Sequence, residues 1–233
     1  IAYKTVKGRG LGIIFIHGLN SDMNGAKALS VERYARKNKL NFIRFDCRGH
    51  GKSEGKFEEF TISDWKRDLL DIIDNVSTGP QILIGSSMGG WLMMLAAKVR
   101  PKKIKGMIGL AAAPDFGKEL YSSLNKKNKK EINSMNITKY SSYGFSYYLT
   151  KKFFIDAEKN RVLKKPFRFN KPLVLIHGLK DTVVKENIPR KIMKKVTGKN
   201  VNIIYLKESD HRLSNETDLE LITQSINYIR NNI

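Results

Sequence analysis

Short apolar runs alternate along the chain with longer stretches in which apolar residues recur at helical spacing. The runs are apolar almost throughout and often β-branched, which is typical of parallel strands covered on both faces. They predict strands at 12–16, 41–45, 81–85, 104–110, 172–176 and 201–206. The stretches between them predict helices near 25–38, 62–75, 88–99, 188–197 and 215–231. This alternation predicts an α/β fold, with a mostly parallel central sheet and helices on both faces.

Two segments fall outside this alternation. The opening "IAYKTV" has the pattern of a strand that pairs at one edge of the sheet. Residues 117–170 separate two predicted strands by far more than a normal connection, and nine aromatic residues lie between Tyr140 and Phe169. We therefore expect residues 1–233 to form a single domain with a cap inserted at about 117–170. Its aromatic residues either line an acyl pocket or form the cap's own small core.

Length and composition fit a globular protein of one domain. No apolar run reaches the roughly 18 residues that a membrane-spanning helix needs. The single cysteine, Cys47, excludes an intramolecular disulfide and fits a reducing compartment. The sequence begins at Ile1 rather than at methionine, so an N-terminal targeting signal can be missing from it.

The formal net charge is +21, and lysine supplies most of it. A charge of this size would suit an acidic partner, such as nucleic acid, anionic lipid or a negatively charged substrate. The densest run, "NKKNKK" at 125–130, lacks the interleaved aromatics of a strand-binding surface. We therefore expect no specific nucleic-acid partner, and we favour a compositional habit rich in lysine and asparagine.

The stretch "GSSMGGW" contains the pattern G-x-S-x-G in one register only, with Ser87 at its centre. It follows a predicted strand and begins a predicted helix, which is the context of a nucleophile elbow. In that sharp turn the central residue is driven toward positive φ, and glycines are needed at Gly85 and Gly89 to avoid clashes. Ser87 is therefore the predicted nucleophile, and Ser86 is its structural neighbour.

A serine nucleophile needs a base that is itself oriented by an acid. His211, just after the last predicted strand, stands where an α/β-hydrolase places its base, whereas His17 and His177 precede glycines at strand ends and more readily shape loops. The chain order of nucleophile, acid and base favours Asp181, which follows the strand at 172–176. Asp115 is the second candidate for the acid, whereas Asp210 is better explained as a loop residue.

The oxyanion of the tetrahedral intermediate needs two N–H donors. We expect one from the backbone of Met88, directly after the nucleophile, and the other from Leu19, in the loop after the first long strand. We expect no cofactor and no metal site. The run "GHGKS" imitates a phosphate-binding loop, but Asp46 stands where that loop requires glycine, and no Cys/His/Asp cluster has zinc spacing.

The runs "NGAKALS", "IRFDCRGHGKSEG", "GPQILIGSSMGGWLMMLAA" and "SDHR" together resemble the α/β-hydrolase-domain palmitoyl-protein thioesterase and acyl-glucuronide deacylase family of mitochondrial serine hydrolases. The similarity extends over most of the chain and is strongest around the elbow. It implies a triad of Ser87, Asp181 and His211, and hydrolysis of carboxylic esters and acyl thioesters without a cofactor.

We therefore expect a serine hydrolase that acts on acyl esters or thioesters, including acylated proteins. The alternatives are a general bacterial carboxylesterase or lipase with no depalmitoylating role, and a non-catalytic binding protein on the same scaffold. The lysine- and asparagine-rich composition looks bacterial and predicts a cytoplasmic location, with the mitochondrial matrix as the alternative for a eukaryotic member.

Overall fold

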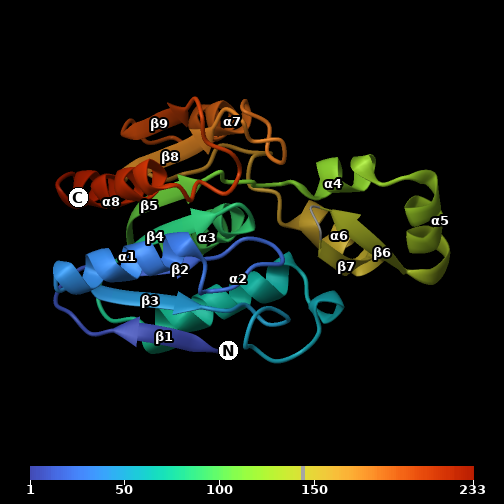
Figure 1. Cartoon of the computed structure of the whole chain (residues 1–233), viewed down its shortest axis with the longest axis horizontal. Helices are drawn as coiled ribbons and strands as arrows, with labels where there is room; N and C mark the ends of the chain where they lie inside the picture. The colour runs from blue at the N-terminus through green and yellow to red at the C-terminus, as the bar shows by residue number, and fades with distance from the viewer. Residues whose placement is uncertain (143–144) are drawn as a thin grey trace.

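In the computed structural model, which describes residues 1–142 and 145–233, seven strands form one sheet (Figure 1). Their spatial order is β1-β3-β2-β4-β5-β8-β9, and every neighbouring pair is parallel except β1 with β3. The strands are β1 (Tyr3–Val6), β2 (Gly12–Ile16), β3 (Asn41–Phe45), β4 (Gln81–Ser86), β5 (Ile104–Leu110), β8 (Leu173–Gly178) and β9 (Val201–Leu206). The predicted fold class is confirmed, and "IAYKTV" does pair at a sheet edge.

Helices cover both faces of this sheet because its strands are apolar on both sides. Side chains that alternate along β2 point into two separate cores, with Ile13 and Phe15 in one and Ile14 and Ile16 in the other. The first core is closed by α1 (Ala26–Lys37) and α8 (Glu216–Arg230), and the second by α2 (Ile62–Asp71), α3 (Met88–Val99) and α7 (Ile188–Lys195). The helix predicted at 62–75 continues past α2 as a π-helical turn, Ile72–Val76. A short 3₁₀ turn, Phe57–Glu59, precedes α2.

Between β5 and β8 the chain adds α4 (Gly117–Ser123), α5 (Lys126–Met135), the hairpin of β6 (Ile137–Ser142) and β7 (Phe145–Thr150), and α6 (Lys151–Lys159). We call residues 117–170 the insertion. Figure 1 shows its helices and hairpin beside the main sheet, beyond the ends of the central strands. The division of the chain into one domain and a cap stays a prediction.

The insertion is fastened to the body at α6. The Asp156 carboxylate accepts hydrogen bonds from the backbone N–H of Ser63 at 2.8 Å and from its hydroxyl at 2.6 Å. Ser63 lies in the first turn of α2, where backbone N–H groups lack helical partners and a negative charge is favourable. The indole of Trp91 in α3 also donates to the Asn160 carbonyl at 3.0 Å. These contacts hold the base of the insertion against two helices of the body.

Candidate active site

Ser87 occupies a strained turn between β4 and α3. Its φ of 52° and ψ of −114° lie in a region that residues other than glycine rarely adopt. A Cβ on Gly85 would stand 2.3 Å from the Gly89 carbonyl oxygen, and one on Gly89 would stand 2.3 Å from the Ile16 carbonyl oxygen. Only glycines fit at these two positions, because the obstacles are backbone atoms. The turn places Ser87 at the N-terminal end of α3, where the helix dipole is positive.

Asp181 and His211 meet beyond the ends of β8 and β9. The Nδ1 atom of His211 lies 2.8 Å from Oδ2 of Asp181. The other carboxylate oxygen of Asp181 accepts the backbone N–H groups of Val183 and Val184, each at 2.8 Å. The Asp181 side chain is fully buried, and a quarter of the His211 side chain is exposed.

Electrostatics favour an ionised Asp181. Burial acts to raise the pKa of its carboxyl, but the bond to His211 and the two amide donors outweigh burial, and the pKa lies below its usual value. An ionised carboxylate accepts hydrogen bonds only, so the Nδ1 atom of His211 must carry the proton. The Nε2 atom is then the nitrogen of this imidazole that is free of a proton.

The other acids considered from the sequence have different contacts. Asp115, after β5, accepts the backbone N–H of Val162 at 2.7 Å and of Leu163 at 2.9 Å, and so ties the two ends of the insertion together. Asp210 accepts the N–H of Arg212 at 2.9 Å. The structure thus pairs His211 with Asp181 and not with either alternative.

His177 supports the loop that carries Asp181. Its buried ring bonds the Val184 carbonyl through Nε2 at 3.0 Å, and this nitrogen lies 3.9 Å from Asp181. Burial lowers the pKa of His177. A neutral ring fixes the turn after β8 without competing for the Asp181 charge, in keeping with the loop-shaping role expected from the sequence.

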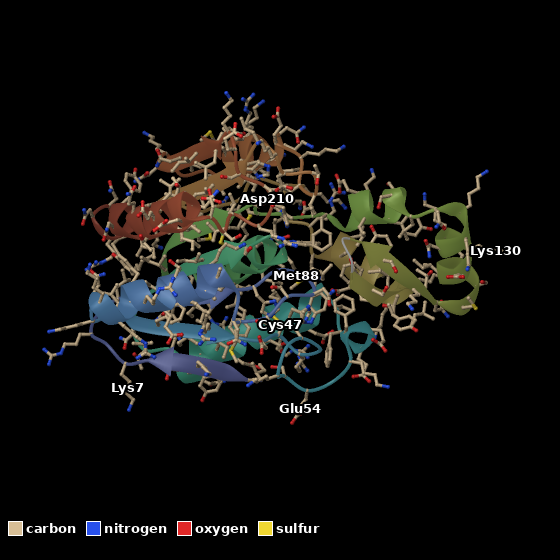
Figure 2. The ribbon with its side chains drawn as sticks, viewed as in Figure 1. Lys7, Cys47, Glu54, Met88, Lys130 and Asp210 are labelled. Atoms are coloured by element: carbon tan, nitrogen blue, oxygen red, sulfur yellow. The ribbon has the colours of Figure 1, made fainter. Side chains whose placement is uncertain are left out.

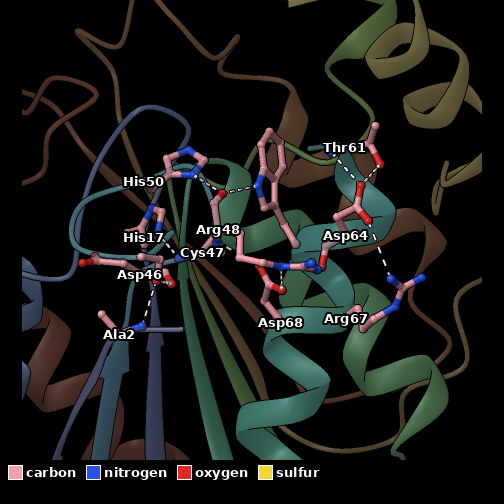
Figure 3. Close-up of polar contacts among 12 residues, drawn as sticks. Ala2, His17, Asp46, Cys47, Arg48, His50, Thr61, Asp64, Arg67 and Asp68 are labelled. Atoms are coloured by element: carbon pink, nitrogen blue, oxygen red, sulfur yellow. Dashed lines mark hydrogen bonds and ion pairs between the residues drawn. The ribbon is translucent and has the colours of Figure 1, made fainter. Parts of the chain in front are cut away.

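A second pair of histidines, His17 and His50, lies beside Asp46 and Cys47, with ring centroids 4.9 Å apart (Figure 3). The Nε2 atom of His17 accepts the backbone N–H of Cys47 at 3.0 Å, and Nδ1 lies 2.7 Å from the Gly18 carbonyl oxygen. Since Nε2 accepts a hydrogen bond, the ring proton must be on Nδ1, which donates it to the Gly18 carbonyl oxygen. Burial lowers the pKa of His17, so the ring is neutral. The orientation of the Gly18–Leu19 peptide is therefore held by a side chain, which the sequence alone indicated only as loop-shaping.

Ser87, His211 and Leu19 line one cavity of about 1310 Å³. Its apolar wall includes Phe15, Phe116, Leu120, Tyr140 and Tyr147. The last two come from the insertion and are paired across the β6–β7 hairpin.

The other aromatic residues between Tyr140 and Phe169 show whether this group lines the cavity or fills a core. Phe153, Phe167 and Phe169 are buried in the core, and Phe154 packs against it. Tyr148 is exposed, and the side chains of Tyr143 and Phe145 lie outside the described residues. The aromatic residues of the insertion therefore divide between cavity wall and core, a division that their spacing in the sequence did not indicate.

Within the described part of the chain, no helix is long and apolar enough to cross a membrane. Among those same residues, no cluster of three or more His, Cys, Asp or Glu side chains is placed to hold a metal ion.

Comparison with known proteins identifies a family, a curated relative and solved structures to which this chain is similar. A family model described as serine aminopeptidase, S33, matches residues 11–142. The human protein named palmitoyl-protein thioesterase ABHD10, mitochondrial, is 40% identical over 230 residues, which are 97% of this chain and 75% of that protein. The structure of α/β hydrolase domain-containing protein 10 from mouse matches with a TM-score of 0.91 and 37% identity, over 98% of this chain and 93% of that one. A putative hydrolase from Agrobacterium vitis S4 matches with a TM-score of 0.93 and 27% identity, over 97% and 92% of the two chains.

Proposed function

The chain belongs to the α/β-hydrolases of the serine aminopeptidase S33 family, and from this premise we propose that it is a serine hydrolase of acyl esters and thioesters. Ser87 is the nucleophile, His211 the base and Asp181 the orienting acid. One observation carries the proposal. The partly buried Asp181–His211 hydrogen bond stands at the cavity into which the strained turn presents Ser87.

The reaction proceeds in two halves. The Nε2 atom of His211 takes the hydroxyl proton of Ser87 as the serine oxygen bonds to the acyl carbon. The tetrahedral intermediate collapses, the bond to the alcohol or thiol breaks, and His211 returns the proton to that leaving group. Water then attacks the acyl-enzyme with the same proton transfers, which releases the carboxylic acid and restores Ser87.

The negative oxygen of each intermediate is bound by the backbone N–H groups of Leu19 and Met88. Within the described residues, neither N–H has a hydrogen-bond acceptor in the protein. Leu19 lines the cavity, and Met88 is the first residue of α3. Free donors beside the nucleophile are what an oxyanion hole requires, and the bond from His17 to Gly18 supports this arrangement.

The apolar wall of the cavity favours an acyl group as the bound portion of the substrate. The thioesterase name of the human relative favours thioesters, acylated proteins included. A general carboxylesterase or lipase is the alternative, and a chain-length series of p-nitrophenyl esters and matched thioesters separates the two. A non-catalytic scaffold would hydrolyse neither series.

The composition also leads us to propose a cytoplasmic location, with the mitochondrial matrix as the alternative that the name of the human relative favours. Fractionation of the source cells decides between them.

The decisive experiment combines turnover and labelling. We expect the protein to hydrolyse p-nitrophenyl acyl esters and to be labelled by a fluorophosphonate at Ser87. Ser87→Ala abolishes both signals, while Ser86→Ala, the matched change one residue earlier, retains them. Asp181→Asn lowers kcat by about 10⁴, because the amide can favour the wrong His211 tautomer. Unchanged turnover in Ser87→Ala would refute the proposal.

A further inference from the structure

Basic residues are concentrated in the insertion. Residues 117–170 contain 13 lysines and arginines but 4 aspartates and glutamates, whereas the whole chain has 43 and 22. The ratio is above three in the insertion and about two in the whole chain. The insertion is therefore richer in basic relative to acidic residues than the chain as a whole.

The insertion also contains a hollow of about 630 Å³ between α4, α5 and α6, separate from the cavity at Ser87. Its apolar lining includes Tyr121 from α4, Ile132 from α5, and Phe154 and Ile155 from α6. Half of the Ile155 side chain is exposed. Ile132 is buried, and Tyr121 and Phe154 are half-buried, so Ile155 is the exposed one of these four residues. An apolar hollow with an exposed isoleucine at its edge is suited to an apolar occupant.

Lysines lie in and beside the lining of this hollow, which also includes the acidic residues Asp115 and Glu158. Lys151 and Lys159 of α6 line it, four residues to either side of Ile155 and therefore on the same helix face. On α5, Asn133 lines the hollow, and Lys130 and Lys126 precede it by three and seven residues, again on one face. We call Lys126, Lys130, Lys151 and Lys159 the rim lysines.

Among the described residues, the rim lysines have no acidic partners. The ion pairs in the described part of the insertion use Lys127, Arg161 and Lys164, and none uses a rim lysine. All four side chains are exposed. Their charges are therefore available to an external anion.

We propose that the insertion docks on an anionic lipid surface, with the rim lysines at the head groups and the exposed Ile155, at the edge of the apolar hollow, entering the interface. Cationic side chains around exposed apolar ones are the combination that holds peripheral proteins on membranes. A nucleic acid would use the lysines but would leave the apolar hollow without a partner, so the observations favour lipid.

Docking here would also serve the reaction. Lys118 and Arg161 line both the hollow and the cavity at Ser87, so α4 and the end of α6 stand between the two. An acyl group drawn from the membrane would need to pass only this wall. That consequence rests on the proposed function, whereas the docking itself does not.

The test measures co-sedimentation of the full chain with vesicles of phosphatidylglycerol and phosphatidylcholine, and with vesicles of phosphatidylcholine alone. We expect binding to the anionic vesicles only, weakened by salt. The variant K126E/K130E/K151E/K159E should bind at least about 100-fold more weakly, since one lysine near an anionic surface contributes about fivefold in affinity.

A matched variant, K4E/K7E/R9E/K37E, removes the same charge from the opposite part of the molecule. Figure 2 shows Lys7 and Lys130 toward opposite ends of the view. This control should bind the vesicles as the wild type does, while I155D should weaken binding with the rim lysines intact. Both quadruple variants should hydrolyse water-soluble p-nitrophenyl acetate at the wild-type rate, which separates this test from that of the proposed function.

The proposal is overturned by equal binding to neutral vesicles, by equal losses in the two quadruple variants, or by undiminished binding of I155D. Binding of duplex DNA that depends on the rim lysines, without vesicle binding, would assign the surface to nucleic acid. A wild type that binds vesicles but hydrolyses nothing would leave the docking surface standing and reject the proposed function.

Discussion

The imidazole of His17 accepts the backbone N–H of Cys47 at 3.0 Å and thereby joins the loop after β2 to the loop after β3. The contact fixes which ring nitrogen carries the proton, and that proton is donated to the Gly18 carbonyl. The N–H of the same peptide belongs to Leu19, one of the two proposed oxyanion donors.

His17→Phe removes both bonds while keeping an aromatic ring of similar size. We expect kcat to fall about 10- to 100-fold with little change in KM, because a donor that is poorly held loses most of its effect on the transition state. Steady-state kinetics with a p-nitrophenyl ester gives the numbers. His50→Phe is the control, since the His50 ring lies 4.9 Å from that of His17 but bonds the Arg48 carbonyl rather than Gly18 or Leu19. Equal kcat values for the two variants would contradict the positioning role.

A substitution at Gly18 tests the distance between the loop that carries Leu19 and the proposed nucleophile, Ser87. A Cβ at this position would stand 3.2 Å from the Cβ of Ser87, so Gly18→Ala should push the two apart by a few tenths of an ångström. We expect kcat to drop about tenfold or more, with a small change in Tm. Gly25→Ala is the matched substitution, because nothing lies within 4 Å of its added Cβ. Its activity should equal that of the wild type, and parallel losses in both variants would count against the model of the site.

His50 should make the protein sensitive to acid. Burial, with a smaller contribution from His17, lowers the pKa of His50 to about 3, whereas the unfolded chain titrates near 6.5. Between these values the unfolded state binds a proton that the folded state does not. Stability therefore falls as the pH is lowered from about 6.5 toward 3, by about 1.4 kcal/mol for each unit at the steepest.

His50→Phe should flatten this part of the stability curve, because phenylalanine binds no proton in either state. The substitution also preserves edge contacts like those that the ring makes with Phe57 and Trp65. Urea unfolding at pH 7, 6, 5 and 4 measures the slope. A variant with the same slope as the wild type would show that other groups govern the acid response.

Asp115 should control how firmly the insertion is held at its base. Asp115→Asn keeps the size of the side chain and tolerates the φ of 60° at this position, but it leaves one acceptor, the amide oxygen, where the carboxylate offered two. Losing a buried acceptor costs about 1–3 kcal/mol, so the amides of Val162 and Leu163 should exchange with solvent faster. Hydrogen exchange measured by mass spectrometry reports this, with Asp22→Asn on an exposed loop as the control. Unaltered exchange at both amides would show that the Asp115 carboxylate does not hold the base of the insertion.

The sequence by itself determined the order of the main elements and the bounds of several of them. The strands at 12–16, 41–45, 104–110 and 201–206 and the helix at 88–99 have the bounds that the hydrophobic pattern predicted. For the first three strands the reason is that a strand buried on both faces leaves a nearly continuous apolar run, whereas β9 keeps an apolar run although its residues are at most half-buried. The turn at Ser87 could also be predicted from the sequence, because its requirements are local. Glycines before and after one serine are required by contacts with backbone close by in the chain or in the adjacent strand.

Tertiary structure alone decided the relationships between distant segments. Three aspartates had plausible positions beside a strand, and only the placement of β8 against β9 brings Asp181, and not Asp115 or Asp210, to His211. The division of the insertion aromatics between cavity and core, the bond from His17 to Cys47 and the hollow between α5 and α6 were likewise invisible in the sequence. Local pattern specifies which face of an element is buried, whereas the partner across that face depends on how all the elements pack together.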